Sequence, residues 1–302
     1  MMEPEDLCTI KERLPSWLKK KKSLKELRTL KVRFRNARLS TVCEEARCPN
    51  ITECFSVPTA TFLILGDICT RGCRYCSINK GTPGPPDEHE PAEVARAAKD
   101  LGLDHVVITS VSRDDLLDQG AYAFAKTISE IRRTLPLATI EVLTPDFSAQ
   151  ASLAEVVFNE KPDVFNHNVE TVARLYPCVR PEARLETSLN LLRMAHDNSE
   201  PLVVKSGFMV GLGEKENEIR DLIVSLKQAG CDIITIGQYM QPTKRQTPVV
   251  KYWHPDHFKQ WSDLAKKIGI RYVISGPLIR SSYRAKEALE GIRQNHGCNS
   301  DG

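Results

Sequence analysis

Residues 61–76, "TFLILGDICTRGCRYC", join an apolar strand pattern directly to three closely spaced cysteines. Positions 61–67 are apolar or β-branched on both faces, as a strand covered on two sides requires. Cys69, Cys73 and Cys76 follow with the spacing C-x3-C-x2-C. The stretch therefore predicts a buried strand whose carboxyl end leads into a cysteine-bearing loop, and such strand ends are where parallel α/β folds place chemistry.

Six further strand patterns follow, at residues 105–111, 139–145, 164–170, 202–210, 232–239 and 271–277. Helical patterns alternate with them, for example at 91–102, 121–135 and 215–230, and Gly102 and Gly230 stand where helices are expected to end. Repeated βα units form a parallel sheet with right-handed crossovers, either barrel-like or open and doubly wound. The number of units favours an α/β fold, a partial (β/α) barrel of about six parallel strands.

Three regions are predicted along the chain. Residues 1–60 lack the βα order and form an N-terminal extension, residues 61–278 form the barrel, and residues 279–302 form a short segment that closes over the barrel mouth. The extension contains a basic run, residues 19–38, which opens with four lysines. That run is either a solvated helix face or a docking surface for an acidic protein.

Composition places the protein among ordinary globular proteins. Of its 302 residues 41% are hydrophobic and 27% charged, and the net charge of +3 gives no support for a nucleic-acid or membrane partner. No apolar segment is long enough to span a bilayer, and the polar opening "MMEPEDLCTIKERLP" argues against a secretory signal or a transit peptide. We therefore expect a cytoplasmic protein, in which ten cysteines indicate metal binding or catalysis more than disulfides.

The C-x3-C-x2-C spacing has four competing interpretations. A structural zinc site needs four ligands, and a redox C-x-x-C pair would leave Cys69 without a role. An electron-transfer ferredoxin cluster also requires four thiolates. Three thiolates suit a [4Fe–4S] cluster that leaves one iron open, and an open coordination position is typical of a catalytic metal site. The spacing favours this last interpretation.

This cysteine motif, with Tyr75 before its last cysteine, resembles that of the radical S-adenosylmethionine superfamily. The resemblance implies that S-adenosylmethionine binds the open iron of the cluster on Cys69, Cys73 and Cys76. Residues 207–214, "GFMVGLGE", resemble the strand that backs the adenine in that superfamily. The matching positions are Gly207, Met209, Gly211 and Glu214.

A second cysteine triad lies upstream. Cys43, Cys48 and Cys54 have the spacing C-x4-C-x5-C and also lack a fourth cysteine. The two triads together closely resemble the lipoyl synthase family, as do "RLPSWLKKK", "VVITSVSRDDLLDQGA" and "FNHNVET". The resemblance implies that the first triad holds an auxiliary [4Fe–4S] cluster. Its fourth ligand would be a serine of "RSSY", residues 280–283: Ser282, with Ser281 as the second choice.

The same resemblance implies a sulfurtransferase reaction, the radical insertion of two sulfur atoms at carbons six and eight of a protein-bound octanoyl-lysine. The auxiliary cluster would donate the sulfur, and a 5′-deoxyadenosyl radical would remove the hydrogens. The implied partners are lipoyl carrier domains, namely 2-oxo acid dehydrogenase acyltransferase subunits and the glycine cleavage H protein. An electron donor such as ferredoxin or flavodoxin is also implied. The alternatives are a biotin synthase-like enzyme acting on a free small molecule and a zinc-binding interaction module.

Polar residues at the carboxyl ends of the predicted strands are candidates for binding S-adenosylmethionine. Helix capping is the ordinary alternative role for any of them. With Tyr75 and Met209 from the motifs, the expected cofactor-binding residues are Thr109, Asn168, Glu170, Lys205 and Gln238.

Overall fold

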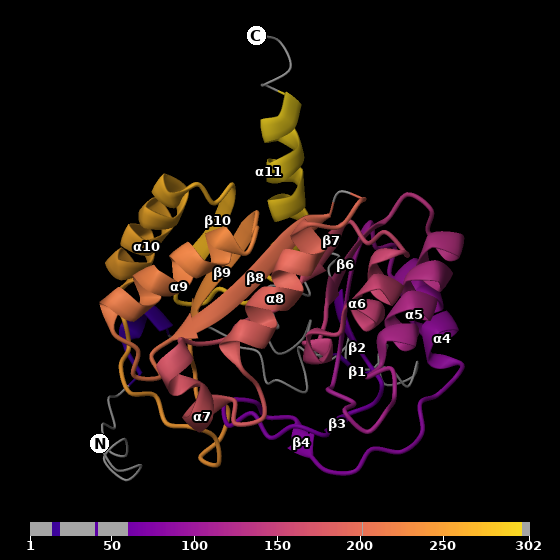
Figure 1. The fold of residues 1–302 in the computed structure, drawn as a ribbon, viewed down its shortest axis with the longest axis horizontal. Helices are drawn as coiled ribbons and strands as arrows, with labels where there is room; N and C mark the ends of the chain where they lie inside the picture. The colour runs from indigo at the N-terminus through magenta and orange to yellow at the C-terminus, as the bar shows by residue number, and fades with distance from the viewer. Residues whose placement is uncertain (1–13, 19–39, 42–59, 201, 298–302) are drawn as a thin grey trace.

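Parallel strands alternate with helices in the structure, a computed structural model that describes residues 14–18, 40–41, 60–200 and 202–297 (Figure 1). One sheet has the order β1-β2-β5-β6-β7-β8-β9-β10. Every neighbouring pair from β2 to β10 is parallel, whereas β1 is antiparallel to β2. β1 and β10 are the two edges of this sheet, so the barrel is partial.

The strands of this sheet are β1 (Ser40–Thr41), β2 (Ala60–Ile64), β5 (His105–Ser110), β6 (Thr139–Leu143), β7 (Val164–Asn166), β8 (Val203–Val210), β9 (Ile233–Gln238) and β10 (Tyr272–Gly276). A separate two-stranded ribbon consists of β3 (Ile68–Cys69) and β4 (Asn79–Lys80). All seven predicted strands are confirmed, each within a few residues of its expected bounds. The parallel strands thus number seven rather than six.

The longer helices are α4 (Glu90–Asp100), α5 (Ala121–Thr134), α6 (Ala151–Phe158), α8 (Leu185–His196), α9 (Glu216–Gln228), α10 (Pro255–Ile268) and α11 (Ala285–Gly297). Single turns are η2 (Ser16–Leu18), η3 (Phe147–Ala149), η4 (Ala173–Leu175) and α7 (Tyr176–Val179). Gly102 and Gly230 follow α4 and α9 at φ +64° and +82°, the left-handed conformation that glycine adopts without steric cost. In the part of the chain that the structure describes, no helix is both long and apolar enough to cross a membrane.

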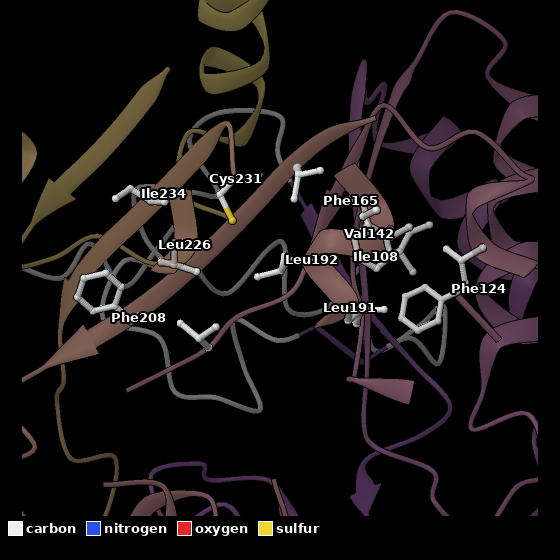
Figure 2. Packing of buried hydrophobic residues seen from close by; sticks show 14 of the residues in the cluster. Ile108, Phe124, Val142, Phe165, Leu191, Leu192, Phe208, Leu226, Cys231 and Ile234 are labelled. Atoms are coloured by element: carbon white, nitrogen blue, oxygen red, sulfur yellow. The ribbon is translucent and has the colours of Figure 1, made fainter. Parts of the chain in front are cut away.

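The main hydrophobic core lies between the sheet and its helices. Figure 2 shows Ile108, Val142 and Phe165, from neighbouring strands, packed together with Phe124 of α5 and Leu192 of α8. These side chains are fully buried. Burial of such side chains is worth about 1.5–3 kcal/mol each, which holds the helices on the outer face of the sheet.

The inner face of the sheet contains a buried polar cluster. Lys205 of β8 and Glu141 of β6 form an ion pair in which both side chains are 0% exposed. The Lys205 ammonium donates to both Glu141 oxygens (2.8 and 2.9 Å), and Asn166 Nδ2 of β7 donates to Oε1 (2.9 Å). The cluster ties three adjacent strands together across their parallel ladder.

The chain after β10 divides between the two ends of the sheet. Residues 277–284 start at the carboxyl edge, where the Gln238 backbone N–H donates to Pro277 O (3.3 Å). α11 lies at the amino edge, on the opposite end of the sheet from β3 and β4 (Figure 1), because Ala288 and Ile292 pack on Ile233, the first residue of β9. Of the described part of the C-terminal segment predicted at residues 279–302, residues 279–284 follow the carboxyl edge and α11 lies at the amino edge.

Lys205→Met is expected to destabilise the fold by about 3–5 kcal/mol, because it leaves the Glu141 carboxylate buried without its cation. The double variant Lys205→Met/Glu141→Leu should recover most of that loss, since no buried charge remains. Denaturant unfolding followed by circular dichroism measures both. Equal midpoints for Lys205→Met and the unchanged protein would contradict a charged pair in this interior.

Candidate active site

The cysteine loop is closed by the ribbon of β3 and β4. Cys69 ends β3, its carbonyl accepts from Gly81 N (3.0 Å), and Cys76 N closes a tight turn on Cys73 O (3.1 Å). The sequence predicted an irregular loop directly after the first strand. The short ribbon was not expected, because its two strands are only two residues long and carry no alternating pattern.

Cys69, Cys73 and Cys76 line one pocket at the carboxyl edge of the sheet. The pocket has a volume of about 150 Å³ and is partly open to solvent. Four of the residues predicted to bind S-adenosylmethionine also line it: Tyr75, Thr109, Asn168 and Glu170. The strand-end argument therefore accounts for Thr109, Asn168 and Glu170, whereas Tyr75 comes from the cysteine motif itself.

Burial raises the pKa of the Cys73 thiol, and it raises that of Cys76 to about 12. Iron would supply the positive charge that thiolates buried in this way require. Within the described residues, no group of three or more His, Cys, Asp or Glu side chains is close enough together to hold a single metal ion.

The Cys69 sulfur accepts two backbone hydrogen bonds, from Arg71 N (3.4 Å) and from Ser112 N (3.3 Å). Such N–H donors surround the thiolate ligands of iron–sulfur clusters and influence their reduction potential. Three thiols around one pocket, with donors on a sulfur, fit a cluster held by three cysteines.

Glu170 and Arg180 bring opposite charges to the same pocket. β7 ends at Asn166, but the chain pairs with β8 again at Glu170, where the backbone N–H donates to Gly207 O (3.0 Å). Glu170 itself has a left-handed backbone conformation, with φ +66°. Burial raises the pKa of Glu170, against the opposing effect of nearby Arg180. The buried Arg180 side chain donates through Nη1 to Asn168 O (3.1 Å). The pocket can therefore bind a ligand that carries both charges.

Four residues that line this pocket carry a buried side-chain polar atom with no hydrogen-bond partner among the described residues. The atoms are Ser110 Oγ, Thr144 Oγ1, Asn168 Oδ1 and Arg180 Nε. Unsatisfied buried groups are rare in folded proteins, and each needs an explanation such as a ligand. Unpaired hydroxyl, amide and guanidinium groups on lining residues are suited to a polar ligand such as an amino acid or a nucleoside.

The other predicted binding residues lie away from the pocket lining. Lys205 is engaged by Glu141 inside the barrel. Gln238 donates to Lys251 O (3.0 Å) and accepts from Trp253 N (3.0 Å), which secures the segment after β9. Met209 packs against the hydrophobic core.

The motif residues after β8 organise a turn. The Glu214 carboxylate accepts from Gly211 N, from Leu212 N (2.9 Å) and from the Trp253 indole N–H (3.0 Å). Gly207 allows a close approach, since a Cβ there would meet Asn168 Oδ1 at 2.9 Å. The motif thus shapes the strand end beside the pocket.

The proposed auxiliary site is only partly described. Cys43, Cys48 and Cys54 lie outside the described residues, as does the basic run 19–38. Ser281 and Ser282 lie in the turn after β10, which Tyr283 N closes on Arg280 O (2.9 Å). Their assignment as a ligand stays a prediction.

Sequence reasoning did not identify Arg71, Ser112 and Arg180 as site residues, although all three line the pocket. Arg71 lies inside the cysteine motif itself, and that position is the signal that could have identified it. Arg180 follows α7 in a segment with no recognisable pattern, so the sequence offers no comparable signal for it.

Two solved structures, a methylornithine synthase and a complex with S-adenosylmethionine, have a similar fold. Methylornithine synthase matches with a TM-score of 0.53 at 13% identity, over 78% of this chain and 81% of that one. SuiB of Streptococcus suis bound to S-adenosylmethionine matches with a TM-score of 0.53 at 12% identity, over 74% and 53%. At these identities the similarity establishes the fold alone, a partial barrel of parallel strands alternating with helices.

Comparisons of sequence are more specific. Residues 63–226 match the model of the radical SAM superfamily, and residues 6–48 match the N-terminal domain of lipoyl synthase. The lipoyl synthase of Caldanaerobacter subterraneus is 49% identical over 281 residues, covering 93% of this chain and 99% of the relative. That of Rubrobacter xylanophilus is also 49% identical, covering 93% and 88%. With both cysteine motifs present, the chain belongs to the lipoyl synthase family of radical S-adenosylmethionine enzymes.

Proposed function

We propose that this protein inserts two sulfur atoms, at carbons six and eight, into an octanoyl chain attached to a lysine of a carrier domain. The supporting observation is that the three cysteines of the C-x3-C-x2-C motif line one pocket in a chain 49% identical to lipoyl synthases. The product is a protein-bound lipoyl group. The enzyme is a sulfurtransferase that uses S-adenosylmethionine and two [4Fe–4S] clusters.

Cys69, Cys73 and Cys76 would hold the cluster that binds S-adenosylmethionine. When bound, the cluster and S-adenosylmethionine together supply the radical chemistry that removes hydrogen from an aliphatic carbon. No side-chain base accomplishes this near neutral pH.

Residues around the pocket would orient S-adenosylmethionine. Arg180 is suited to the methionine carboxylate, because its charge lies beside Cys73 and its Nε is buried without a described partner. Glu170, Asn168 and Thr109 offer acceptors for the amino group or the ribose hydroxyls. Tyr75 would pack beside the cluster. Lys205, Met209 and Gln238 would act indirectly, by supporting the strands beneath and beside the pocket.

Cys43, Cys48, Cys54 and Ser282 would hold the auxiliary cluster, which would donate the sulfur atoms. Ser281 is the second choice for the fourth ligand. A serine oxygen is a harder ligand than a thiolate, so its iron would be the corner most easily released. Ser282 would thus have a role in catalysis as well as in metal binding.

Octanoylated carrier domains are the substrates that membership of this family implies. Among carriers, we propose the 2-oxo acid dehydrogenase acyltransferase subunits and the glycine cleavage H protein. Ferredoxin or flavodoxin would supply electrons, and the reaction would take place in the cytoplasm.

Incubation of the anaerobically purified enzyme with octanoylated H protein, S-adenosylmethionine and dithionite is expected to convert octanoyl-lysine to lipoyl-lysine. Mass spectrometry should detect a gain of two sulfur atoms and a loss of two hydrogens. Cys76→Ala should abolish the product, since it removes a cluster ligand. Sulfur insertion into free octanoate, with none into the octanoylated protein, would instead favour the biotin synthase-like alternative.

Iron and acid-labile sulfide per chain test the two cluster sites separately. About eight irons are expected in the unchanged protein and about four in Cys43→Ala/Cys48→Ala/Cys54→Ala. Cys178→Ala is the matched control and should keep about eight, because Cys178 does not line the pocket. Four irons or fewer in the unchanged protein would contradict the auxiliary site, and zinc in place of iron would contradict both.

A further inference from the structure

Arg71 lies between two of the cysteines, and its side chain is only 8% exposed. Its guanidinium donates to two carboxylates on different loops. Nε and Nη2 donate to Asp114 (2.9 and 2.7 Å), in the loop after β5, while Nη1 and Nη2 donate to Asp146 (2.6 and 2.8 Å), after β6. Such a forked arrangement fixes orientation as well as distance, which a lysine could not do.

The charge of Arg71 is already compensated inside this cluster. Burial alone would raise the pKa of the Asp146 carboxyl, but the hydrogen bond and charge of Arg71 lower it to about 2. One cation thus faces two carboxylates, and the group carries no surplus positive charge to attract an anionic ligand. Buried ion pairs of this kind contribute little net stability, so their value lies in geometry.

The geometry that Arg71 fixes includes both N–H donors to the Cys69 sulfur. One donor is the backbone N of Arg71 itself, and the other is that of Ser112. Thr70 joins the two segments, because its N donates to Ser112 O (3.1 Å) and its Oγ1 lies 2.8 Å from Asp114 Oδ2. Asp114 therefore binds both Arg71 and Thr70, which closes the unit around Cys69.

We propose that Arg71, Asp114 and Asp146 form a positioning clamp that holds two N–H donors on Cys69 and thereby raises the reduction potential of the cluster at this site. Hydrogen bonds to a ligand sulfur stabilise the reduced cluster, which carries one more negative charge. The clamp makes the cluster easier to reduce. The inference rests on the proposed function only in placing a cluster on Cys69, Cys73 and Cys76.

Two variants that leave the net charge unchanged test the clamp. Both are made in the Cys43→Ala/Cys48→Ala/Cys54→Ala background, which retains only this cluster. Arg71→Lys keeps the cation but loses the fork, and Thr70→Val keeps the shape but loses the hydroxyl tie. Both should shift the midpoint potential, measured by anaerobic titration with electron paramagnetic resonance, to more negative values. The shift should be smaller for Thr70→Val, which is also the milder change should Arg71→Lys fail to fold.

Arg132→Lys is the matched control. Arg132 also pairs with an aspartate, Asp163 (2.8 Å), but this pair lies near the amino edge of the sheet, away from the pocket. Arg132→Lys should leave the midpoint potential of the cluster unchanged. A general loss of protein stability would not shift that potential either. Potentials unchanged in both Arg71→Lys and Thr70→Val would overturn the clamp. Absence of iron from the background protein itself would overturn the proposed cluster site instead.

Discussion

Parallel pairing of the seven strands from β2 to β10 is the constraint on which the site depends. Parallel strands place all their carboxyl ends at one edge, so loops far apart in the chain meet there. The polar cluster of Lys205, Glu141 and Asn166 reinforces this pairing from inside, because it links β6, β7 and β8 at one level of the barrel. Slippage of β6 or β8 would leave a buried charge without its partner, and slippage of β7 would remove the amide hydrogen bond of Asn166.

The cysteine loop depends on its neighbours for its conformation. Apart from the two-residue strands of its ribbon it has little regular structure, and its backbone is held by hydrogen bonds to several other loops. Thr70 N donates to Ser112 O (3.1 Å), Arg74 N to Val179 O (2.9 Å), and Thr247 N to Arg74 O (2.8 Å). A loop held from three sides presents its sulfurs in a fixed arrangement, which suits a cluster bound at several points.

The two arginines that line the pocket have different surroundings. Arg71 is compensated by Asp114 and Asp146, whereas Arg180 faces Glu170 across the pocket and keeps its Nε unpaired among the described residues. The two arginines therefore have different tasks. Arg71 supports the protein's own backbone, and Arg180 is the residue that we propose for the carboxylate of the ligand.

The sequence by itself determined the alternation of strands and helices, the cysteine spacing and the family. Apolar periodicity and ligand spacing are local properties, so they can be recognised in the sequence alone. Tertiary structure alone decided which strand-end polar groups face the pocket. Lys205 pairs with Asn166 across the ladder and so lies one layer below Asn168, inside the barrel, while the Gln238 side chain secures the segment after β9. The depth of a side chain in the barrel and the direction in which it points follow from the pairing between strands. No single segment of the sequence encodes that pairing.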